Sequence, residues 1–78
     1  MKREIPILYL VVPCYNEEEV VEKSARVMRD KICRLIKEGK IKTGSKIMFV
    51  NDGSKDNTLR LLHQIAAQDE IFSVISLA

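Results

Sequence analysis

Cysteine, histidine and tryptophan are scarce in this sequence of 78 residues, which has two cysteines, one histidine and no tryptophan. The cysteines, Cys14 and Cys33, lie nineteen residues apart and form no C-x-x-C unit. Zinc sites usually need four Cys or His ligands, and small secreted domains usually carry four or more cysteines in disulfides. The composition argues against both scaffolds and predicts two reduced thiols, as in a cytoplasmic protein.

The sequence also lacks a long hydrophobic run and a large charge excess. No apolar segment approaches the ~18 residues that a membrane-spanning helix needs. Thirteen Lys and Arg against eleven Asp and Glu leave a formal net charge of +2. The basic residues between positions 23 and 37 are scattered among acids, which favours a solvated face and does not indicate a nucleic acid partner. With 46% hydrophobic and 31% charged residues, the chain has the composition of a small globular unit.

Three apolar segments alternate with two helical patterns. The first segment, residues 5–12, reads IPILYLVV and is apolar throughout, which is typical of a parallel strand covered on both faces. Residues 46–50 and 72–77 are two further strand-like segments. A helix is predicted to begin at Asn16, a favoured N-cap followed by three glutamates, and to end at Gly39. Its apolar stripe is Val21, Ala25, Met28, Ile32 and Leu35 or Ile36, and that of the second helix is Leu59, Leu62, Ile65 and Ala66.

This order predicts an α/β fold, namely the β-α-β-α-β half of a doubly wound, Rossmann-like parallel sheet with three α/β/α layers. Three strands are few for such a sheet, and the sequence ends within the third. We therefore expect residues 1–78 to be the N-terminal, nucleotide-binding part of a longer domain. The third strand would be an exposed edge, through which the chain could self-associate.

Ligands of open parallel sheets lie outside the carboxyl ends of the strands, so the two loops that follow the first and second strands are the candidate binding segments. The first, residues 13–17, offers Tyr15, Glu17 and the backbone amides of a helix start. The second, residues 51–56, offers Asp52, the hydroxyl of Ser54 and Gly53, which lets a ligand approach the backbone closely. Asp52 could accept a hydrogen bond from a base N–H, and Glu17 from ribose hydroxyls.

Each loop taken alone also has a purely structural explanation. Asn16 and the glutamates after it could only cap a helix, and Asp52-Gly53 could only form a turn. Asp56 and Asn57 precede Thr58 and could cap the second helix. Cys14 is expected to be a buried apolar residue, because no histidine is near it in the sequence. The G-x-G-x-x-G and G-x-x-x-x-G-K-[ST] phosphate motifs are absent, which argues against a dinucleotide fold proper and a P-loop NTPase.

The two loops taken together indicate a protein family, which neither loop does alone. The strings VVPCYNEE at residues 11–18 and FVNDGSKDNT at residues 49–58 strongly resemble the start of family 2 glycosyltransferases, which have a GT-A fold. The resemblance covers nearly the whole chain and is strongest to the branch of dolichyl-phosphate mannosyltransferase and bacterial undecaprenyl-phosphate glucosyltransferases. The sequence departs from the commonest family pattern at Asn51, where the family often has an aspartate.

The resemblance implies a set of donor-site residues. By resemblance, Pro13 and Tyr15 line the base pocket, Glu17 meets the ribose, and Asp52 reads the base. Gly53 and Ser54 would shape the second loop. Asn16 and Asp56 belong to the same expected nucleotide site.

The resemblance also implies an activity for the full-length protein. This is inverting transfer of a sugar from a UDP- or GDP-linked donor to an acceptor, with a polyprenyl phosphate as the acceptor suggested by the branch. A divalent metal, Mg²⁺ or Mn²⁺, would assist, and the enzyme would act in the cytoplasm, either at the cytoplasmic face of a membrane or as a free-standing soluble transferase. The metal ligands and the catalytic base would lie outside this sequence, so residues 1–78 are expected to be inactive alone. The alternatives are a non-catalytic module of the phospho-receiver or nucleotide-binding kind, or a folding unit that binds nothing.

Overall fold

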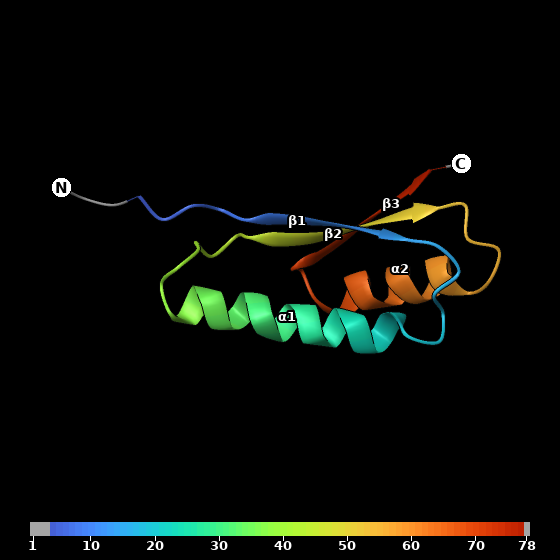
Figure 1. Ribbon diagram of the computed structural model, residues 1–78, viewed down its shortest axis with the longest axis horizontal. Helices are drawn as coiled ribbons and strands as arrows, with labels where there is room; N and C mark the ends of the chain where they lie inside the picture. The colour runs from blue at the N-terminus through green and yellow to red at the C-terminus, as the bar shows by residue number, and fades with distance from the viewer. Residues whose placement is uncertain (1–3, 78) are drawn as a thin grey trace.

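The structure is a computed structural model that describes residues 4–77, and it contains three strands and two helices in alternation (Figure 1). The predicted β-α-β-α-β order is confirmed. None of the helices in this range is both long and apolar enough to cross a bilayer. The elements are β1 (Tyr9–Cys14), α1 (Val21–Lys37), β2 (Lys46–Asp52), α2 (Thr58–Gln68) and β3 (Phe72–Leu77).

The strands form one parallel sheet in the order β1-β2-β3, with Val12 opposite Phe49 and Phe49 opposite Val74. Both helices cover the same face of this sheet (Figure 1). The strand order never reverses, so two crossovers of the same hand must place their helices on one side. The three-layer arrangement predicted from the sequence is therefore not seen within residues 4–77, which form two layers.

The core lies between the sheet and the two helices. Phe49, Ile47 and Leu62 are completely buried there, and the rings of Phe49 and Phe72 stack with centroids 5.5 Å apart. The predicted stripe of α1 is confirmed, and that of α2 is confirmed except at Leu59, which is half-buried outside the core while Leu61 packs against it. Val21, Ala25, Ile32 and Leu62 are buried, whereas Met28, Leu35, Ile36, Ile65 and Ala66 pack partly buried against the core.

The opposite face of the sheet is open within the described residues. Tyr9 and Val11 of β1 are 63% and 59% exposed, and Ile75 and Leu77 of β3 are 44% and 50% exposed. The continuous apolar run in β1 predicted cover on both faces, but the described residues cover one face only. Alternate residues of β1 and β3 therefore present apolar side chains to solvent.

The first strand begins later than predicted and runs further. β1 pairs with β2 only from Tyr9, opposite Lys46, where β2 itself begins. Residues 6–8 are instead held by the loop before β2, through Lys42 N–H to the Pro6 carbonyl at 2.8 Å and Leu8 N–H to Ser45 Oγ at 3.0 Å. Pro13 lies inside β1 because an edge strand tolerates a missing N–H.

The first helix also begins later than predicted, whereas its end is where the sequence places it. The N-cap is Val20, not Asn16, and it makes no side-chain cap bond. At the other end Gly39 has a φ of +75°, and Gly39 N–H and Lys40 N–H donate to the carbonyls of Ile36 and Leu35. This pair of bonds is a Schellman motif, which favours glycine in the left-handed position.

Candidate functional site at the carboxyl edge of the sheet

The loop after β1 and the loop after β2 are joined by a reciprocal pair of hydrogen bonds. The backbone N–H of Lys55 donates to Asn16 Oδ1 at 2.7 Å, and the backbone N–H of Asn16 donates to Ser54 Oγ at 3.0 Å. Because the partners lie almost forty residues apart in the sequence, these bonds fix the two loops against each other. This explains why Asn16 is not the helix cap: its side chain is engaged across the loops.

A second group of bonds connects the start of α2 to the glutamates after β1. Thr58 Oγ1 accepts the backbone N–H of Glu17 at 2.8 Å, and Asp56 Oδ2 accepts that of Glu18 at 3.3 Å. Asp56 Oδ1 accepts both the hydroxyl and the backbone N–H of Thr58. The side chains of Asn16, Ser54, Asp56 and Thr58 form a set that we call the loop clamp.

Hydrogen bonds to the Asp56 carboxylate have an electrostatic consequence. The Thr58 hydroxyl, followed by the Thr58 and Glu18 amides, holds the pKa of Asp56 below its usual value. Donors stabilise the ionised form, so Asp56 is a carboxylate at neutral pH. The N-cap position of α2 is Asn57, which makes no side-chain cap bond, whereas Asp56, one residue earlier, accepts the backbone N–H of Thr58.

Two residues at this edge adopt left-handed backbone conformations. Asn16 has a φ of +49° and Gly53 a φ of +68°. Asparagine is among the few non-glycine residues that tolerate this region, because its short polar side chain bonds locally. The space where a Cβ of Gly53 would lie is open, so its backbone conformation, and not crowding, favours glycine there.

The predicted ligand-binding side chains fall into two groups. Those of Asn16, Ser54 and Asp56 are taken up by the loop clamp. Those of Pro13, Tyr15 and Asp52 are exposed, Tyr15 to 54%, and Glu17 is half-buried. The clamp therefore holds a ring and two carboxylates at the edge where the strands end. None of these four makes a side-chain hydrogen bond within residues 4–77.

Thr58 is a positioning residue to which the sequence alone assigned no role. It is completely buried, and its hydroxyl holds the backbone of Glu17 while donating to Asp56. The spacing of Asp56 and Thr58 could have predicted their hydrogen bond, because an aspartate and a threonine two residues apart at the start of a helix commonly bond to each other. What the sequence could not indicate is the third partner, which comes from a loop forty-one residues earlier.

Asn51, the departure from the family pattern, lies buried beneath the site. It is 2% exposed, its Nδ2 donates to Ser76 Oγ at 3.3 Å, and its Oδ1 has no hydrogen-bond partner. An aspartate there would bring a charge into a position closed to water, which is costly unless the charge is paired. The neutral amide avoids that charge and bonds to β3.

Cys14 lies beside this edge but is not arranged as a nucleophile. It is 2% exposed, and burial, followed by the nearby Glu17 charge, raises the pKa of its thiol. Both cysteines are free, and Cys33 is exposed on α1. The prediction that Cys14 is a buried apolar residue is confirmed.

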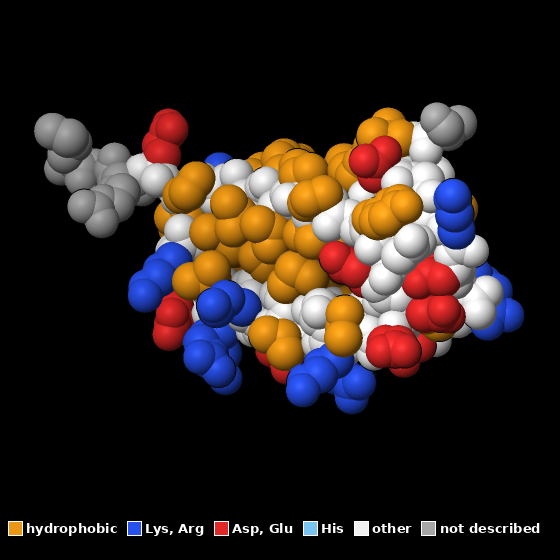
Figure 2. Space-filling model, turned by 45° about the vertical axis from the view of Figure 1, so that its right-hand side comes forward, with side chains coloured by type: hydrophobic (Ala, Val, Ile, Leu, Met, Phe, Trp, Pro, Cys, Tyr) orange, Lys and Arg blue, Asp and Glu red, His pale blue; other side chains and the backbone are white. Residues whose placement is uncertain are grey.

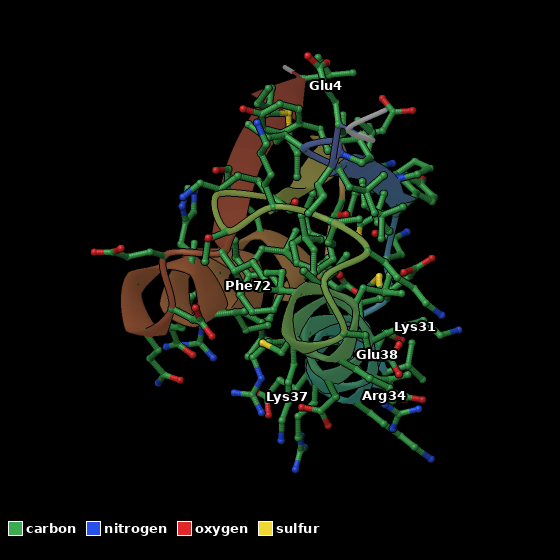
Figure 3. All side chains as sticks on the ribbon, turned by 90° about the vertical axis from the view of Figure 1, so that its left-hand side faces the viewer. Glu4, Lys31, Arg34, Lys37, Glu38 and Phe72 are labelled. Atoms are coloured by element: carbon green, nitrogen blue, oxygen red, sulfur yellow. The ribbon has the colours of Figure 1, made fainter. Side chains whose placement is uncertain are left out.

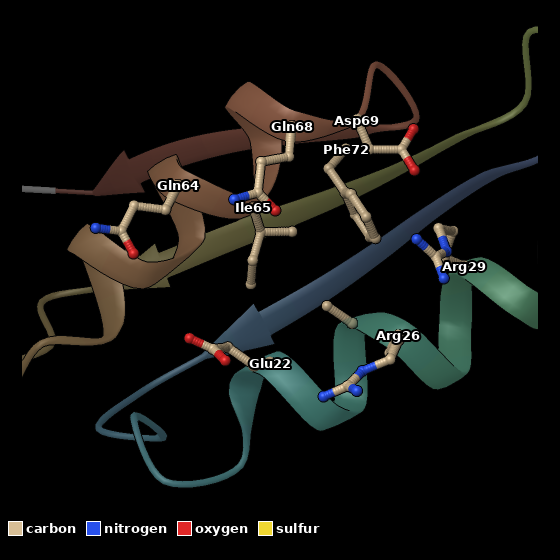
Figure 4. A pocket seen from close by; sticks show the side chains of 9 residues that line it. Glu22, Arg26, Arg29, Gln64, Ile65, Gln68, Asp69 and Phe72 are labelled. Atoms are coloured by element: carbon tan, nitrogen blue, oxygen red, sulfur yellow. The ribbon is translucent and has the colours of Figure 1, made fainter.

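Two grooves flank the helical layer, and only one touches the predicted site. A groove of about 490 Å³ between β1 and α1 is lined by Pro13, Glu17, Lys23 and Ser24 together with apolar side chains that include Val27. Figure 2 shows a broad area of hydrophobic surface on that side of the molecule. The other, of about 400 Å³, lies between α1 and α2 and is lined by Arg26, Arg29 and Gln64 among others (Figure 4). It includes no predicted site residue.

The carboxylates of the site do not form a metal cluster. Among residues 4–77 no three Cys, His, Asp or Glu side chains are close enough to hold a metal ion together. The donor set present here therefore does not fit a divalent metal. What the edge offers is acceptor oxygens, an aromatic ring and a fixed backbone, which suit recognition of a base and a sugar more than chemistry on them.

Known proteins share this sequence pattern. The sequence model described as "Glycosyl transferase family 2" matches residues 9–78. The chain is 40% identical over 78 residues to the uncharacterized glycosyltransferase YkoT of Bacillus subtilis (strain 168), covering 100% of this chain and 23% of YkoT. It is 30% identical over 66 residues to the uncharacterized glycosyltransferase YkcC of the same organism, covering 85% of this chain and 19% of YkcC. The chain thus spans less than a quarter of the length of these curated relatives.

Proposed function

Because this chain belongs to glycosyltransferase family 2, we propose that its two loops form the nucleotide half of a donor site in a sugar-transferring enzyme. One observation carries the proposal. The loop clamp uses Asn16, Ser54 and Asp56 to fix the two loops together, and this leaves Asp52 and Tyr15 exposed at the carboxyl edge of the sheet. Fixed, exposed acceptors at that edge are what a nucleotide site in an open parallel sheet requires.

Each exposed group has a role in this proposal. Asp52 accepts the ring N–H that uracil and guanine both present, so the donor is a UDP- or a GDP-sugar. Glu17 accepts from the ribose hydroxyls, and Tyr15 and Pro13 pack against the base. Gly53 allows the second loop to approach the nucleotide. The clamp residues keep these groups in place without reacting.

The remaining parts of the enzyme lie outside the described residues in this proposal. The catalytic base, the acceptor site and the ligands of an assisting Mg²⁺ or Mn²⁺ would be in the rest of the longer protein. The acceptor we propose is a polyprenyl phosphate, as in the branch that the two loops resemble, with the enzyme at the cytoplasmic face of a membrane and a role in cell-envelope glycan synthesis. The reaction would be an inverting transfer, and this chain alone would be inactive.

The rival proposal, a phospho-receiver module, finds less support. Such a module gathers several acids around one metal ion, and the described residues contain no cluster of that kind. The first loop instead carries Pro13 and Tyr15, which suit contact with a planar base.

Calorimetric titration with UDP- and GDP-sugars tests the proposed role of Asp52. In the longer protein that contains this chain, Asp52→Ala should weaken donor binding by roughly 1.5 to 3 kcal/mol, the range for a hydrogen bond to a charged group. Asp30→Ala is the matched control, because it removes one exposed carboxylate from α1, away from the loops. Unchanged donor affinity in Asp52→Ala would refute the assignment.

A further inference from the structure

The first helix carries a concentration of positive charge, and of its basic residues Lys23 alone lines the groove beside the proposed donor site. α1 contains six Lys and Arg against two Asp and Glu, a formal charge of +4, whereas the whole chain carries +2. The rest of the chain is therefore net negative. Figure 2 shows several Lys and Arg side chains along the lower margin with a few Asp and Glu among them, and a mixture of acidic and basic side chains on the right.

Four of the basic residues share the side of α1 that points away from the sheet. Counted from Lys23, the other three follow after three, eleven and fourteen residues. At 3.6 residues per turn, these spacings place all four on one side of the helix. The buried residues Val21, Ala25 and Ile32 lie on the other side. Figure 3 shows Arg34 and Lys37 projecting from the helix away from the sheet. The four, all exposed, are Lys23, Arg26, Arg34 and Lys37.

Neighbouring acids reduce this charge but do not cancel it, because Glu22 is the one exposed acid of α1 besides Asp30, and Glu38, which follows the helix, pairs with Lys40 at 3.5 Å. Asp30 lies on the same side of α1, but its carboxylate is paired with Arg29 at 3.3 Å. The adjacent helix α2 adds Arg60 and contains no Asp or Glu. The outer surface of the helical layer is consequently positive over most of the length of α1, which is about 25 Å at 1.5 Å per residue.

One apolar side chain is exposed within the basic group. Val27 is 57% exposed and stands one turn from Lys23 and two turns from Arg34. A small apolar side chain surrounded by Lys and Arg suits the boundary between lipid headgroups and acyl chains, where the charged groups stay in water and the apolar group is buried.

We propose that the basic face of α1, made of Lys23, Arg26, Val27, Arg34 and Lys37, binds the surface of an anionic phospholipid bilayer. Clusters of four or more basic residues on an amphipathic helix are attracted to anionic headgroups. Single-stranded nucleic acid is a poorer match, because its binding sites add aromatic rings for base stacking and α1 has none. The inference rests on the charges of α1 and not on the proposed donor chemistry.

Co-sedimentation with vesicles tests this proposal. The chain should bind vesicles of phosphatidylglycerol and phosphatidylcholine at low salt, and should not bind vesicles of phosphatidylcholine alone. The double variant Arg34→Gln/Lys37→Gln should bind the anionic vesicles about 25-fold more weakly, at about fivefold per basic residue. The matched control Lys42→Gln/Lys55→Gln removes the same charge from the loops beside β2 and should stay within twofold of the wild type.

Three results would overturn the proposal. They are no binding of the wild type to anionic vesicles at low salt, an equal loss in the Lys42 and Lys55 control, and retention on single-stranded RNA without binding to vesicles. Nucleotide affinity of Arg34→Gln/Lys37→Gln should not change, since both substituted side chains lie on α1, away from the two loops. A failure of membrane binding would thus be distinguishable from a failure of the donor site.

Discussion

At the scale of single residues, the site depends on side chains that hold loops more than on side chains that face a ligand. Asn16 illustrates this: its carboxamide oxygen and backbone N–H both bond to the loop after β2, while its backbone is left-handed. Thr58 does the same from the other loop, at the buried start of α2. Substitutions at these positions should therefore act on ligand binding indirectly, by releasing Tyr15 and Glu17.

Asp56 should make the folding stability of the chain depend on pH in the acid range. Because its pKa is lower in the folded state than the value of about 3.9 for an unfolded chain, its contribution to stability is complete above that unfolded pKa. It is lost as the pH falls below about 4 and through the folded pKa. The urea concentration at the unfolding midpoint should therefore change little between pH 7 and pH 5, and it should decrease when the pH is lowered below 4.

The variant Asp56→Asn isolates that effect. It should lower the unfolding midpoint at pH 7, because the amide supplies one acceptor oxygen where the carboxylate supplies two. It should also show a shallower decrease in acid than the wild type. The control Asp30→Asn makes the same charge change on the outer face of α1. An acid slope in Asp56→Asn equal to that of the wild type would contradict the role given to this carboxylate.

At the scale of elements, the features that depend on local sequence patterns could be predicted, whereas those that depend on distant partners could not. The strand and helix order, the stripe of α1, the stripe of α2 apart from Leu59, the Gly39 cap and the bounds of β3 were predicted correctly. The start of α1 was wrong, because Asn16 bonds to Lys55 and Ser54, partners that no local pattern reveals. The start of β1 was wrong because a strand exists only where a neighbour pairs with it, and β2 begins at Lys46.

The two faces of β1 allow a direct test of the observed layers. Val12 lies opposite Phe49 on the face that the helices cover, whereas Val11 is 59% exposed on the open face. Thr has nearly the same shape as Val but carries a hydroxyl. Val12→Thr should lower the free energy of unfolding by about 1 to 2 kcal/mol, and Val11→Thr by less than about 0.5 kcal/mol. Equal costs in urea denaturation would mean that both faces of β1 are covered.

At the scale of the whole molecule, the two proposed binding surfaces lie at different places on the fold. The carboxyl edge of the sheet carries Asp52 and the other proposed nucleotide contacts, and the outer face of α1 carries four exposed basic residues. The curated relatives are more than four times longer, since the chain covers 23% of YkoT and 19% of YkcC. Both edge strands, β1 and β3, have one neighbour within the described residues.

Unpaired strand edges lead to a prediction about association. We expect the chain at high concentration to form dimers through the β3 edge, because such an edge presents unpaired backbone groups to another chain. Sedimentation velocity at rising concentration should show this, and Ile75→Lys should suppress it. Val11→Lys, on the exposed face of β1, is the control. Equal suppression by both variants would contradict a contact at the β3 edge alone and would place it on the open face of the sheet or at both edges.

The central claim is that the two clamped loops bind a nucleotide, and nuclear magnetic resonance titration of the ¹⁵N-labelled chain with UDP and GDP tests it most directly. The account predicts that amide signals of residues 15–18 and 52–56 shift with one or both nucleotides, and that those of Arg26, Arg29 and Gln64, in the groove between the helices, do not. Shifts confined to that groove, or no shifts at millimolar nucleotide, would contradict the account.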